Sequence, residues 1–404
     1  MRRLKLVVVG TMASEPYAGM AWMNMQIVAG LQRLGHDAWY FETTSTWPYD
    51  PDLGTRVCAG NRAVAYLDRV ARAFGLDGKW AYRRSYSDGA WLGASRSVAE
   101  DVLASADAVF NVAGASRFEP EGLKTGPLIY FGTDPVFHEL AYASGDWLVR
   151  DIVDAHVASV TYGENIGRPG CVIPPLPNLR ARTRQPVLMD KWDNEVQSRA
   201  TFTTVGNWRQ EGRDVAYLGD TYLWSKHHEF GKFIDLPIRI DEELELATNL
   251  SDPSTILHAI ENVVKTMGMD YDDSVDLVRN GWKLVAGTDI SRDPSTYRDY
   301  IQKSHGEFTV ARDLNVRLKS GWFSERSACY LAAGRPVITQ DTGFGTVLPT
   351  GEGLFAFSTM DEILAAFDSV RADYKRNSEA ARSIAHEYFR AETVLSKLIA
   401  DLGL

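Results

Sequence analysis

Residues 313–345, DLNVRLKSGWFSERSACYLAAGRPVITQDTGFG, constrain the fold more than any other stretch of this chain. Their order predicts a polar loop, a helix that opens near Ser324, a turn at residues 334–336, a short strand at residues 337–339 and a second loop that contains glycine. Two polar loops would therefore lie at the same edge of a parallel sheet. Open α/β sheets bind ligands at that edge, because helix N-termini and free loop amides point there.

The N-terminal segment predicts a complete strand, helix and strand unit. Residues 4–9 are an uninterrupted apolar run, which is typical of a strand buried on both faces. Apolar side chains recur at helical spacing over residues 21–34, Gly35 closes that helix, and residues 38–42 predict the next strand. The loop at residues 10–19 lacks the GxGxxG pattern, so dinucleotide binding is not supported.

The rest of the chain indicates a second α/β part. We expect strands at residues 108–112, 128–131, 157–161, 201–205, 282–285 and 308–311, and helices at residues 97–103, 256–267, 360–374 and 378–404. Residues 43–92 show a less regular pattern of helices and strands and contain many aromatic residues. Five prolines between residues 169 and 186 predict a linker.

A chain of 404 residues exceeds one ordinary core, so two domains are expected. We predict an N-terminal domain over residues 1–180, a linker over residues 181–200 and a second domain over residues 201–384. A C-terminal helix at about residues 385–404 is assigned to the first domain.

Charge and cysteine content limit the partners and the compartment. The net charge of −10 argues against a broad nucleic-acid or anionic-membrane surface, so any phosphate site must be local. Cys58, Cys171 and Cys329 match neither a disulfide framework nor a metal-ligand spacing. The apolar run near the N-terminus is too short for a signal peptide, and no segment is long enough to span a bilayer. We therefore expect a cytoplasmic protein.

An anion site is predicted where the helix opens after residues 319–324. Helix amides and the cations Lys319 and Arg326 would converge on one ligand, although a capped helix with solvated charges is the simpler alternative. Lys226 follows the first strand of the second part and can reach the same edge. Gly206 ends that strand and allows close backbone approach. The loop residues counted with this site are Ser320, Gly321 and Ser324.

A hydroxyl-binding loop is predicted next to that anion site. Gln340 and Asp341 can form hydrogen bonds with hydroxyl groups, while Gly343 and Gly345 let backbone amides approach a ligand closely. A phosphate site beside a hydroxyl site predicts a sugar nucleotide as ligand.

Four segments resemble the GT-B-fold glycosyltransferases. Residues 330–338 are similar to the "EALACGTPV" segment of the glycogen-synthase-like retaining clan, and residues 340–345 to its "ATDVGG" donor loop. Residues 205–207, with Lys226 further on, are similar to its glycine loop and diphosphate-binding lysine. Residues 31–38 match the "L…GHxV" turn of the acceptor domains.

The resemblance implies two Rossmann-like domains that face a central cleft, with a C-terminal helix that crosses back to the first. It also implies that side chains and helix dipoles stabilise the leaving diphosphate, with no metal and no other cofactor. The paired glutamates of the retaining clan fall on Cys329 and Gly321 here, and Glu325 is the nearest carboxylate for the ribose hydroxyls. Residues 319–324 instead look like the "HCGWNS" motif of the inverting small-molecule clan, so the stereochemistry stays open.

Acceptor-side candidates lie in the N-terminal part. An inverting enzyme needs a general base, for which Glu15 and Asp134 are candidates and His138 is a third, whereas a retaining enzyme needs none. Aromatic and loop residues that could line an acceptor pocket, or else belong to the core, are Tyr17, Gly19, Trp22, Trp47 and Trp91. Residues 50–52 and 270–272 mimic a DxD metal motif but lie outside the expected donor edge, so we interpret them as loop carboxylates.

We therefore predict a glycosyltransferase that moves a sugar from a nucleoside-diphosphate sugar to a hydroxyl-bearing acceptor, preferably small and hydrophobic. A sugar-nucleotide epimerase and a non-catalytic sugar-nucleotide-binding protein are the alternatives. The expected partners are the sugar nucleotide and the acceptor, without nucleic acid, and the sequence leaves a homodimer open.

Overall fold

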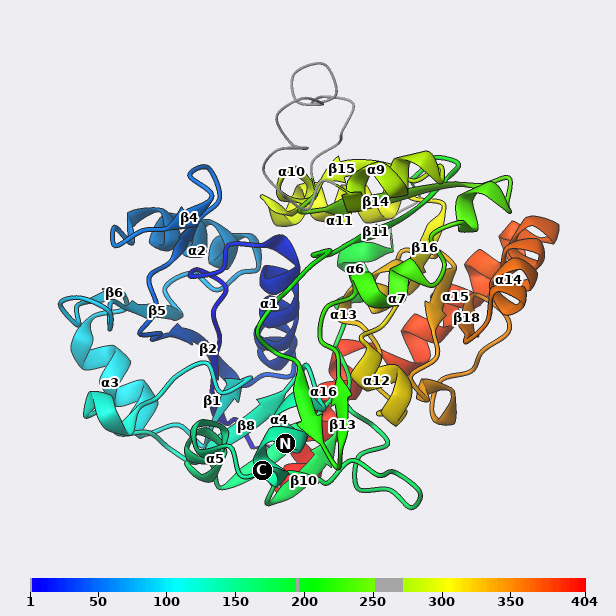
Figure 1. Cartoon of the computed structure of the whole chain (residues 1–404). Coiled ribbons are helices and arrows are strands. Elements are labelled where there is room, and N and C mark those ends of the chain that lie inside the picture. Colours follow the sequence, from blue (N-terminus) through cyan, green and yellow to red (C-terminus); the bar gives the residue numbers. More distant parts are fainter. Residues whose placement is uncertain (1, 194–195, 251–271) are drawn as a thin grey trace, which may run out of the picture.

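The computed structural model describes residues 2–193, 196–250 and 272–404, in which two parallel sheets dominate. We call the part built on the first sheet, residues 2–182, the N-terminal half, and the described residues between 201 and 388 the C-terminal half. Figure 1 shows the halves side by side, with α1 (Ala18–Arg33) on the side of the N-terminal half that faces its neighbour. The helix predicted at residues 256–267 and residues 270–271 of the second DxD-like segment lie outside the described residues.

The first sheet has eight described strands, and β1 lies at its centre. Its pairs are parallel except β5 with β6. Leu6 to Val9 have no solvent-exposed surface, because neighbouring strands and helices cover β1 on all sides. In spatial order the strands are β10 (Leu179–Arg182), β9 (Ala158–Thr161), β8 (Leu128–Gly132), β7 (Ala108–Val112), β1 (Lys5–Val9), β2 (Asp37–Glu42), β5 (Trp80–Arg83) and β6 (Trp91–Gly93).

Residues 43–92, which we expected to be loosely ordered, contain regular structure. Helix α2 (Asn61–Ala73) buries Ala63, Tyr66, Leu67 and Val70, which recur at the 3.6-residue period of a helix. Trp80 and Tyr82 are buried within β5, so these aromatic residues belong to the core. The other elements of this half are α3 (Arg96–Ala104), α4 (Phe137–Ala143), α5 (Trp147–Asp154) and the short β3–β4 hairpin (Tyr49–Asp50 and Thr55–Arg56).

The second sheet is parallel throughout its six described strands. Chain order runs outward from β11 through β14 to β15 and then returns to β16 on the other side of β11. The crevice between the carboxyl ends of β11 and β16 is therefore a topological switch point. In spatial order the strands are β15 (Lys283–Ala286), β14 (Glu243–Thr248), β11 (Thr201–Val205), β16 (Gly306–Thr309), β17 (Val337–Gln340) and β18 (Leu354–Phe357).

The helices of the C-terminal half differ from expectation at two places. Residues 313–318 form α12 (Asp313–Leu318), where we predicted a loop. The expected helix at residues 378–404 is two helices, α15 (Tyr374–Tyr388) and α16 (Ala391–Leu402). The remaining elements are α7 (His227–Gly231), α9 (Asp272–Arg279), α10 (Gly287–Ser291), α11 (Pro294–Lys303), α13 (Glu325–Ala332), α14 (Met360–Ala372) and the β12–β13 hairpin (Val215–Tyr217 and Asp220–Tyr222).

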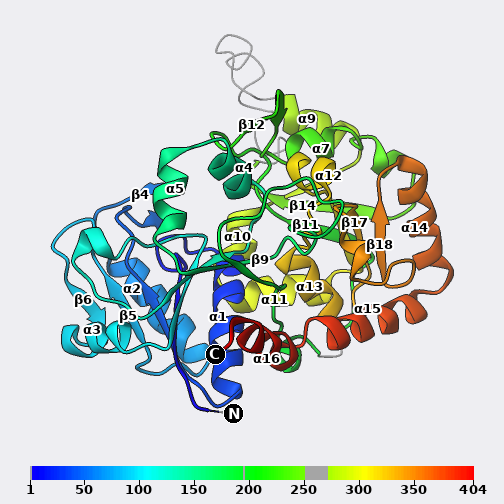
Figure 2. The same cartoon turned by 90° about the horizontal axis from the view of Figure 1, so that it is seen from below.

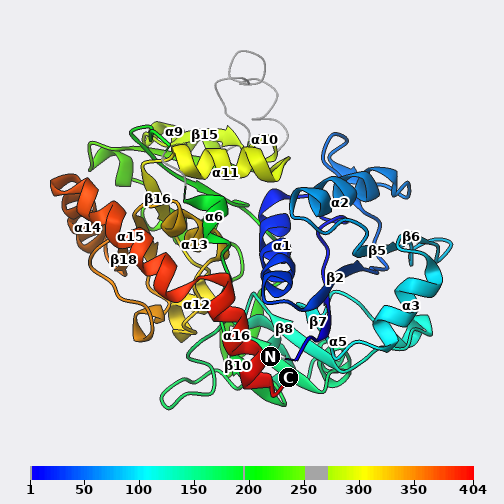
Figure 3. The same cartoon turned by 180° about the vertical axis from the view of Figure 1, so that it is seen from behind.

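The C-terminal helix returns to the N-terminal half, as predicted. Figures 2 and 3 show α15 leading into α16, which lies beside α1 and β10. Leu395 and Leu398 of α16 belong to the same hydrophobic cluster as the first sheet. Strand β10 ends at Arg182, two residues into the segment expected as a linker, and α6 (Met189–Trp192) follows within that segment. None of the described helices combines the length and the apolar character that crossing a membrane requires.

Candidate functional site

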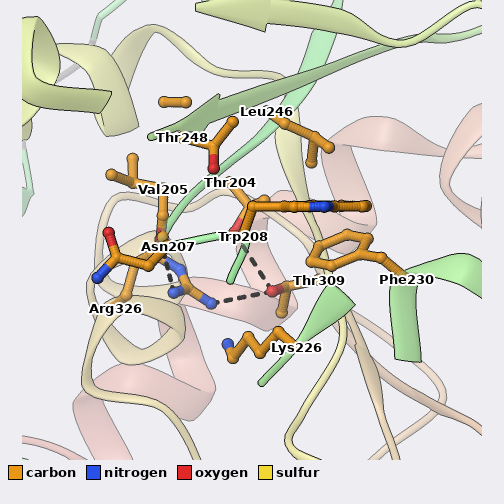
Figure 4. Close-up of a pocket in the computed structure, with 12 residues that line it drawn as sticks. Thr204, Val205, Asn207, Trp208, Lys226, Phe230, Leu246, Thr248, Thr309 and Arg326 are labelled. Carbon is orange, nitrogen blue, oxygen red and sulfur yellow. Dashed lines mark hydrogen bonds between the residues drawn. The ribbon is translucent and has the colours of Figure 1, made fainter. Parts of the chain in front are cut away.

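A pocket opens at the carboxyl ends of β11, β14 and β16, at the switch point of the second sheet (Figure 4). Strands end here with backbone amides and polar side chains free of the sheet ladder, which is why α/β folds place ligands at this position. The lining residues are Thr204, Val205, Gly206, Asn207, Trp208, Lys226, Phe230, Leu246, Ala247, Thr248, Thr309 and Arg326.

Arg326, in the first turn of α13, is built into the floor of this pocket. Its Nε donates to Glu307 Oε1 at 2.5 Å, Nη1 to the Val205 carbonyl at 2.8 Å and Nη2 to Thr309 Oγ1 at 3.0 Å. Burial alone would lower the pKa of Arg326, but the charge of Glu307 raises it above its usual value. Two of the five guanidinium N–H groups remain free for a ligand.

Lys226 directly precedes α7, and Figure 4 shows its side chain in the pocket beside that of Arg326. No hydrogen bond or ion pair of its side chain is found among the described residues, and its Nζ lies 6.0 Å from the centre of the Trp322 ring. Burial, together with the charges of Arg326 and Arg312, lowers the pKa of Lys226 to about 7. An unpaired, half-buried lysine beside two guanidinium groups makes the pocket a site for an anion.

Two aromatic rings form the apolar wall opposite these cations, as Figure 4 shows. The Trp208 and Phe230 ring centres are 5.4 Å apart, and the Trp208 backbone N–H donates to Asn249 Oδ1 at 2.8 Å. Neither residue was among our sequence-based candidates. A signal was available, because Trp208 lies three residues beyond the end of the predicted strand at residues 201–205.

Arg312 and Asp134 connect the two halves near the pocket. Arg312 Nη1 donates to Asp134 Oδ1 at 2.5 Å, and its guanidinium carbon lies 3.8 Å from the centre of the Trp224 ring. Trp322 adds a second link by donating from Nε1 to the Thr133 carbonyl at 3.1 Å. Asp134, a candidate base, is therefore held in an ion pair, and sequence reasoning missed its partner Arg312.

The two loops predicted to hold the donor come together outside the pocket lining. Lys319 Nζ donates to Asp341 Oδ2 at 2.8 Å, and the Gly321 backbone N–H donates to the Thr342 carbonyl at 2.8 Å. Gly343, in the second loop, donates to Asp341 Oδ1 at 2.7 Å. Lys319 is thus neutralised by Asp341, whereas Lys226 is not neutralised.

Two other predicted donor residues, Gln340 and Ser320, form hydrogen bonds within the fold. Gln340 is fully used inside the fold, since it accepts from the Ala311 N–H at 3.2 Å and donates to Glu229 Oε2 at 2.6 Å. We therefore withdraw its hydroxyl-binding role. Ser320 is buried and donates to Asn315 Oδ1 at 2.6 Å, which leaves it no exposed group for a ligand.

In the described part of the chain, four further candidates remain available to a ligand. Ser324 occupies the N-cap of α13, but its hydroxyl forms no capping bond. Glu325, half-buried at the start of α13, has no hydrogen-bond or ion-pair partner among the described residues. Space beside Gly206 and Gly345 is open, since an added Cβ would meet no atom within 3.7 Å.

Part of the predicted acceptor side gathers at the loops that follow β1 and β2. Glu15 forms an ion pair with Arg56, and Arg56 also donates to the Trp47 carbonyl at 2.8 Å. The Tyr17 and Tyr49 rings stack with centres 5.8 Å apart. About half of the Trp47 side chain is exposed, so these loops present aromatic surface to solvent.

Other predicted acceptor residues do not join this group. Trp22 is buried, with its ring centre 4.5 Å from that of Trp192, and its Nε1 donates to the Pro294 carbonyl at 2.9 Å. Trp91 lies on β6, the outermost strand of the first sheet. Gly19 faces Tyr297 of the C-terminal half. We therefore withdraw the acceptor roles of Trp22 and Trp91, because one is enclosed and the other is remote.

Among the described residues, no three His, Cys, Asp or Glu side chains come close enough together to hold a metal ion. Asp50 and Asp52, of the first DxD-like segment, both pair with Arg62. Asp52 lies in the turn of the β3–β4 hairpin, as interpreted from the sequence, whereas Asp50 is the last residue of β3.

Comparison with known proteins found similarity at the level of structure. Models of protein families gave no match, and neither did curated protein sequences. An α-glucosyltransferase solved with UDP and a 13-mer DNA containing an HMU base superimposes with a TM-score of 0.55, at 9% identity over 100% of both chains. Anabaena HepE, solved with UDP and glucose, gives 0.53 at 10% identity over 99% of this chain and 100% of its own.

A glycosyltransferase from Rickettsia africae is similar to the same degree, with a TM-score of 0.51 at 10% identity over 99% of this chain and 98% of its own. At such low sequence identity, the structural similarity shows the fold alone. The similarity extends over nearly the whole chain, and the protein therefore has the GT-B fold, with two Rossmann-like halves.

Proposed function

We propose that this protein is a glycosyltransferase that moves a sugar from a nucleoside-diphosphate sugar to a hydroxyl group of an acceptor. The observation that carries this proposal is Lys226, an unpaired cation of lowered pKa at the switch point of the second sheet. A diphosphate would supply the negative charge that this site lacks. The GT-B fold supports the same reading, since its solved examples include sugar transferases.

The donor half would stabilise the leaving diphosphate as negative charge develops on it. Lys226 and the two free N–H groups of Arg326 would donate to phosphate oxygens, together with the first amides of α13. Because Glu307 already fixes the Arg326 guanidinium, that group would not have to reorganise during the reaction. Glu325, for which the described residues provide no partner, can accept hydrogen bonds from sugar or ribose hydroxyls.

UDP is the first nucleotide to test. The HepE and α-glucosyltransferase structures named above both contain UDP. The Trp208 and Phe230 wall offers an apolar surface opposite the cations, where part of a nucleotide could pack. The α-glucosyltransferase structure also contains DNA. We do not propose DNA as a ligand of this chain, because a net charge of −10 disfavours nucleic-acid binding.

We assign the acceptor to the exposed aromatic loops of the N-terminal half. Tyr17 and Trp47 would contact a small hydrophobic acceptor, and Glu15 lies among them. The two candidate bases, Glu15 and Asp134, each form an ion pair with an arginine, Arg56 and Arg312 respectively. The anomeric configuration of the product decides between inversion, which uses such a base, and retention, which does not.

The test is to incubate the protein with nucleotide sugars, with and without hydroxyl-bearing acceptors, while following nucleoside diphosphate release. Acceptor-dependent release supports transfer, isomerised donor without release indicates an epimerase, and binding alone indicates a non-catalytic protein. Lys226→Met should abolish release, whereas Lys397→Met, at an exposed pair with Asp401 on α16, should not. We further propose a cytoplasmic enzyme without a metal requirement, for which unchanged release in EDTA is the expected result.

A further inference from the structure

One residue of the N-terminal half holds both glycine loops of the C-terminal half. Asn165, in the loop after β9, donates from Nδ2 to the Lys319 carbonyl at 2.9 Å and to the Gly343 carbonyl at 3.1 Å. Its backbone N–H donates to the Ser320 carbonyl at 3.0 Å, and its Oδ1 accepts from Thr346 Oγ1 at 2.7 Å. All the hydrogen-bonding groups of this side chain are thus directed at the two loops.

The glycines of the two loops fit this contact. Gly321 and Gly343 adopt φ values of +78° and +84°, which favour glycine. A Cβ on Gly321 would lie 2.8 Å from the Asn165 backbone nitrogen, and one on Gly343 would lie 2.7 Å from Asn165 Nδ2. Glycine at these positions therefore lets both loops close onto the same asparagine.

Asn165 itself is firmly anchored on its own side. The preceding residue, Glu164, is buried and paired with Arg184 at 2.7 Å, while the following residue, Ile166, is fully buried. The backbone N–H of Ile166 also donates to the Gly163 carbonyl at 3.0 Å. The N-terminal half therefore presents the asparagine in a fixed position, and the two loops adapt to it.

We infer that Asn165 is a positioning residue that sets the two donor loops, so that nucleotide binding to the C-terminal half depends on a hydrogen-bond donor supplied by the N-terminal half. This inference rests on the proposed function, because it assigns the loops at residues 319–321 and 341–346 to the nucleotide site. Asn165 acts through these loops, by fixing the carbonyl groups of Lys319 and Gly343. It therefore need not touch the ligand.

The experiment compares Asn165→Ala and Asn165→Asp with the wild-type protein. Asparagine and aspartate have nearly the same volume, but aspartate would put a carboxylate oxygen against two carbonyl oxygens. Hydrogen exchange of peptides covering both loops reports on positioning without any ligand, and titration with UDP reports on binding. We expect faster exchange in both loops and a UDP dissociation constant raised about tenfold in Asn165→Ala. In Asn165→Asp both effects should be at least as large.

Arg69→Ala is the matched control, since it removes another contact between the halves, the 3.4 Å ion pair of Arg69 with Asp293. Loop exchange and UDP affinity should stay at wild-type values in this variant. Unchanged loop exchange in Asn165→Ala would overturn the inference, and so would faster loop exchange with unchanged UDP affinity. The inference would also fail if Asn165→Asp had the loop exchange and the UDP affinity of the wild-type protein. Wild-type protein that binds neither UDP nor GDP nor dTDP would contradict the proposed function itself.

Discussion

Arg326 and Glu307 form a buried ion pair, in which the guanidinium Nε donates to the carboxylate Oε1 at 2.5 Å. The same guanidinium binds the Val205 carbonyl, so it ties α13 to the ends of β11 and β16. The pocket floor is therefore part of the packing of the C-terminal half. Sequence reasoning treated Arg326 only as a ligand-binding cation, and the structure shows that it also holds the C-terminal half together.

Arg326→Ala should strongly destabilise the protein. Removing the cation leaves the Glu307 carboxylate buried without a counter-charge, which costs about 3–5 kcal/mol in comparable cases. Urea denaturation followed by circular dichroism measures this free energy. Replacing both residues, as Arg326→Met with Glu307→Leu, should recover a large part of the loss, because no charge stays buried. A single Arg326→Ala variant as stable as the wild type would contradict this prediction.

Lys226→Met should have the opposite effect on stability. Lys226 lies beside two guanidinium groups with no ion-pair partner in the described part of the chain, and its pKa is lowered from 10.5 to about 7. Removing this charge should raise the free energy of unfolding by about 1 kcal/mol while abolishing UDP binding. The gain is largest below pH 7, where the folded lysine is charged, and it shrinks as the pH approaches 10.5. Lys397→Met serves as the surface control, with a change within about 0.5 kcal/mol.

UDP affinity should fall as the pH rises above 7. Lys226 must carry a proton to attract the diphosphate, and its pKa in the free protein is about 7. Each pH unit above that value should weaken binding by up to about tenfold, because UDP binding then requires the lysine to take up a proton, and this uptake costs more free energy as the pH rises. Calorimetric titrations between pH 6.5 and pH 9 measure this slope. Lys226→Arg should lose the slope, since arginine stays charged over the whole range. An equal slope in both proteins would exclude Lys226 as its source.

Much of the fold could be predicted because buried parallel strands are continuous apolar runs. Residues 4–9 and 201–205 have that pattern, and they became β1 and β11. Polar or aromatic strands carry weaker signals, which is why β5 and the edge strand β6 were missed. Length and apolar spacing also could not separate α15 from α16, since only the break at residues 389–390 divides them.

Candidate site residues could be predicted where the position of a single residue at the end of a strand or helix indicated its role. Lys226 and Gly206 were found in this way, and both line the pocket. The partners that decide each residue's role were not predictable, because Arg312 pairs with Asp134 and Asn165 contacts Lys319 only once the two halves have folded together. Gln340 shows that a residue at a strand end can also be wrongly predicted to bind a ligand. A polar side chain at a strand end suggested a ligand, but it satisfies the Ala311 amide and contacts Glu229.

Substitutions at Asp134 should separate its structural and chemical roles. Asp134→Ala leaves Arg312 without a carboxylate, and since Arg312 Nε is already buried without a partner, the loss should cost about 2 kcal/mol. A double-mutant cycle with Arg312→Ala should give a coupling energy of about 1 kcal/mol. Asp134→Asn keeps a carbonyl oxygen for Arg312 and should cost less stability. If Asp134 is the base, this variant should nevertheless lose at least about a hundredfold in turnover, because an amide cannot accept the acceptor's proton. Wild-type turnover in Asp134→Asn would leave Asp134 as a contact between the halves, with Glu15 and His138 as the remaining candidate bases.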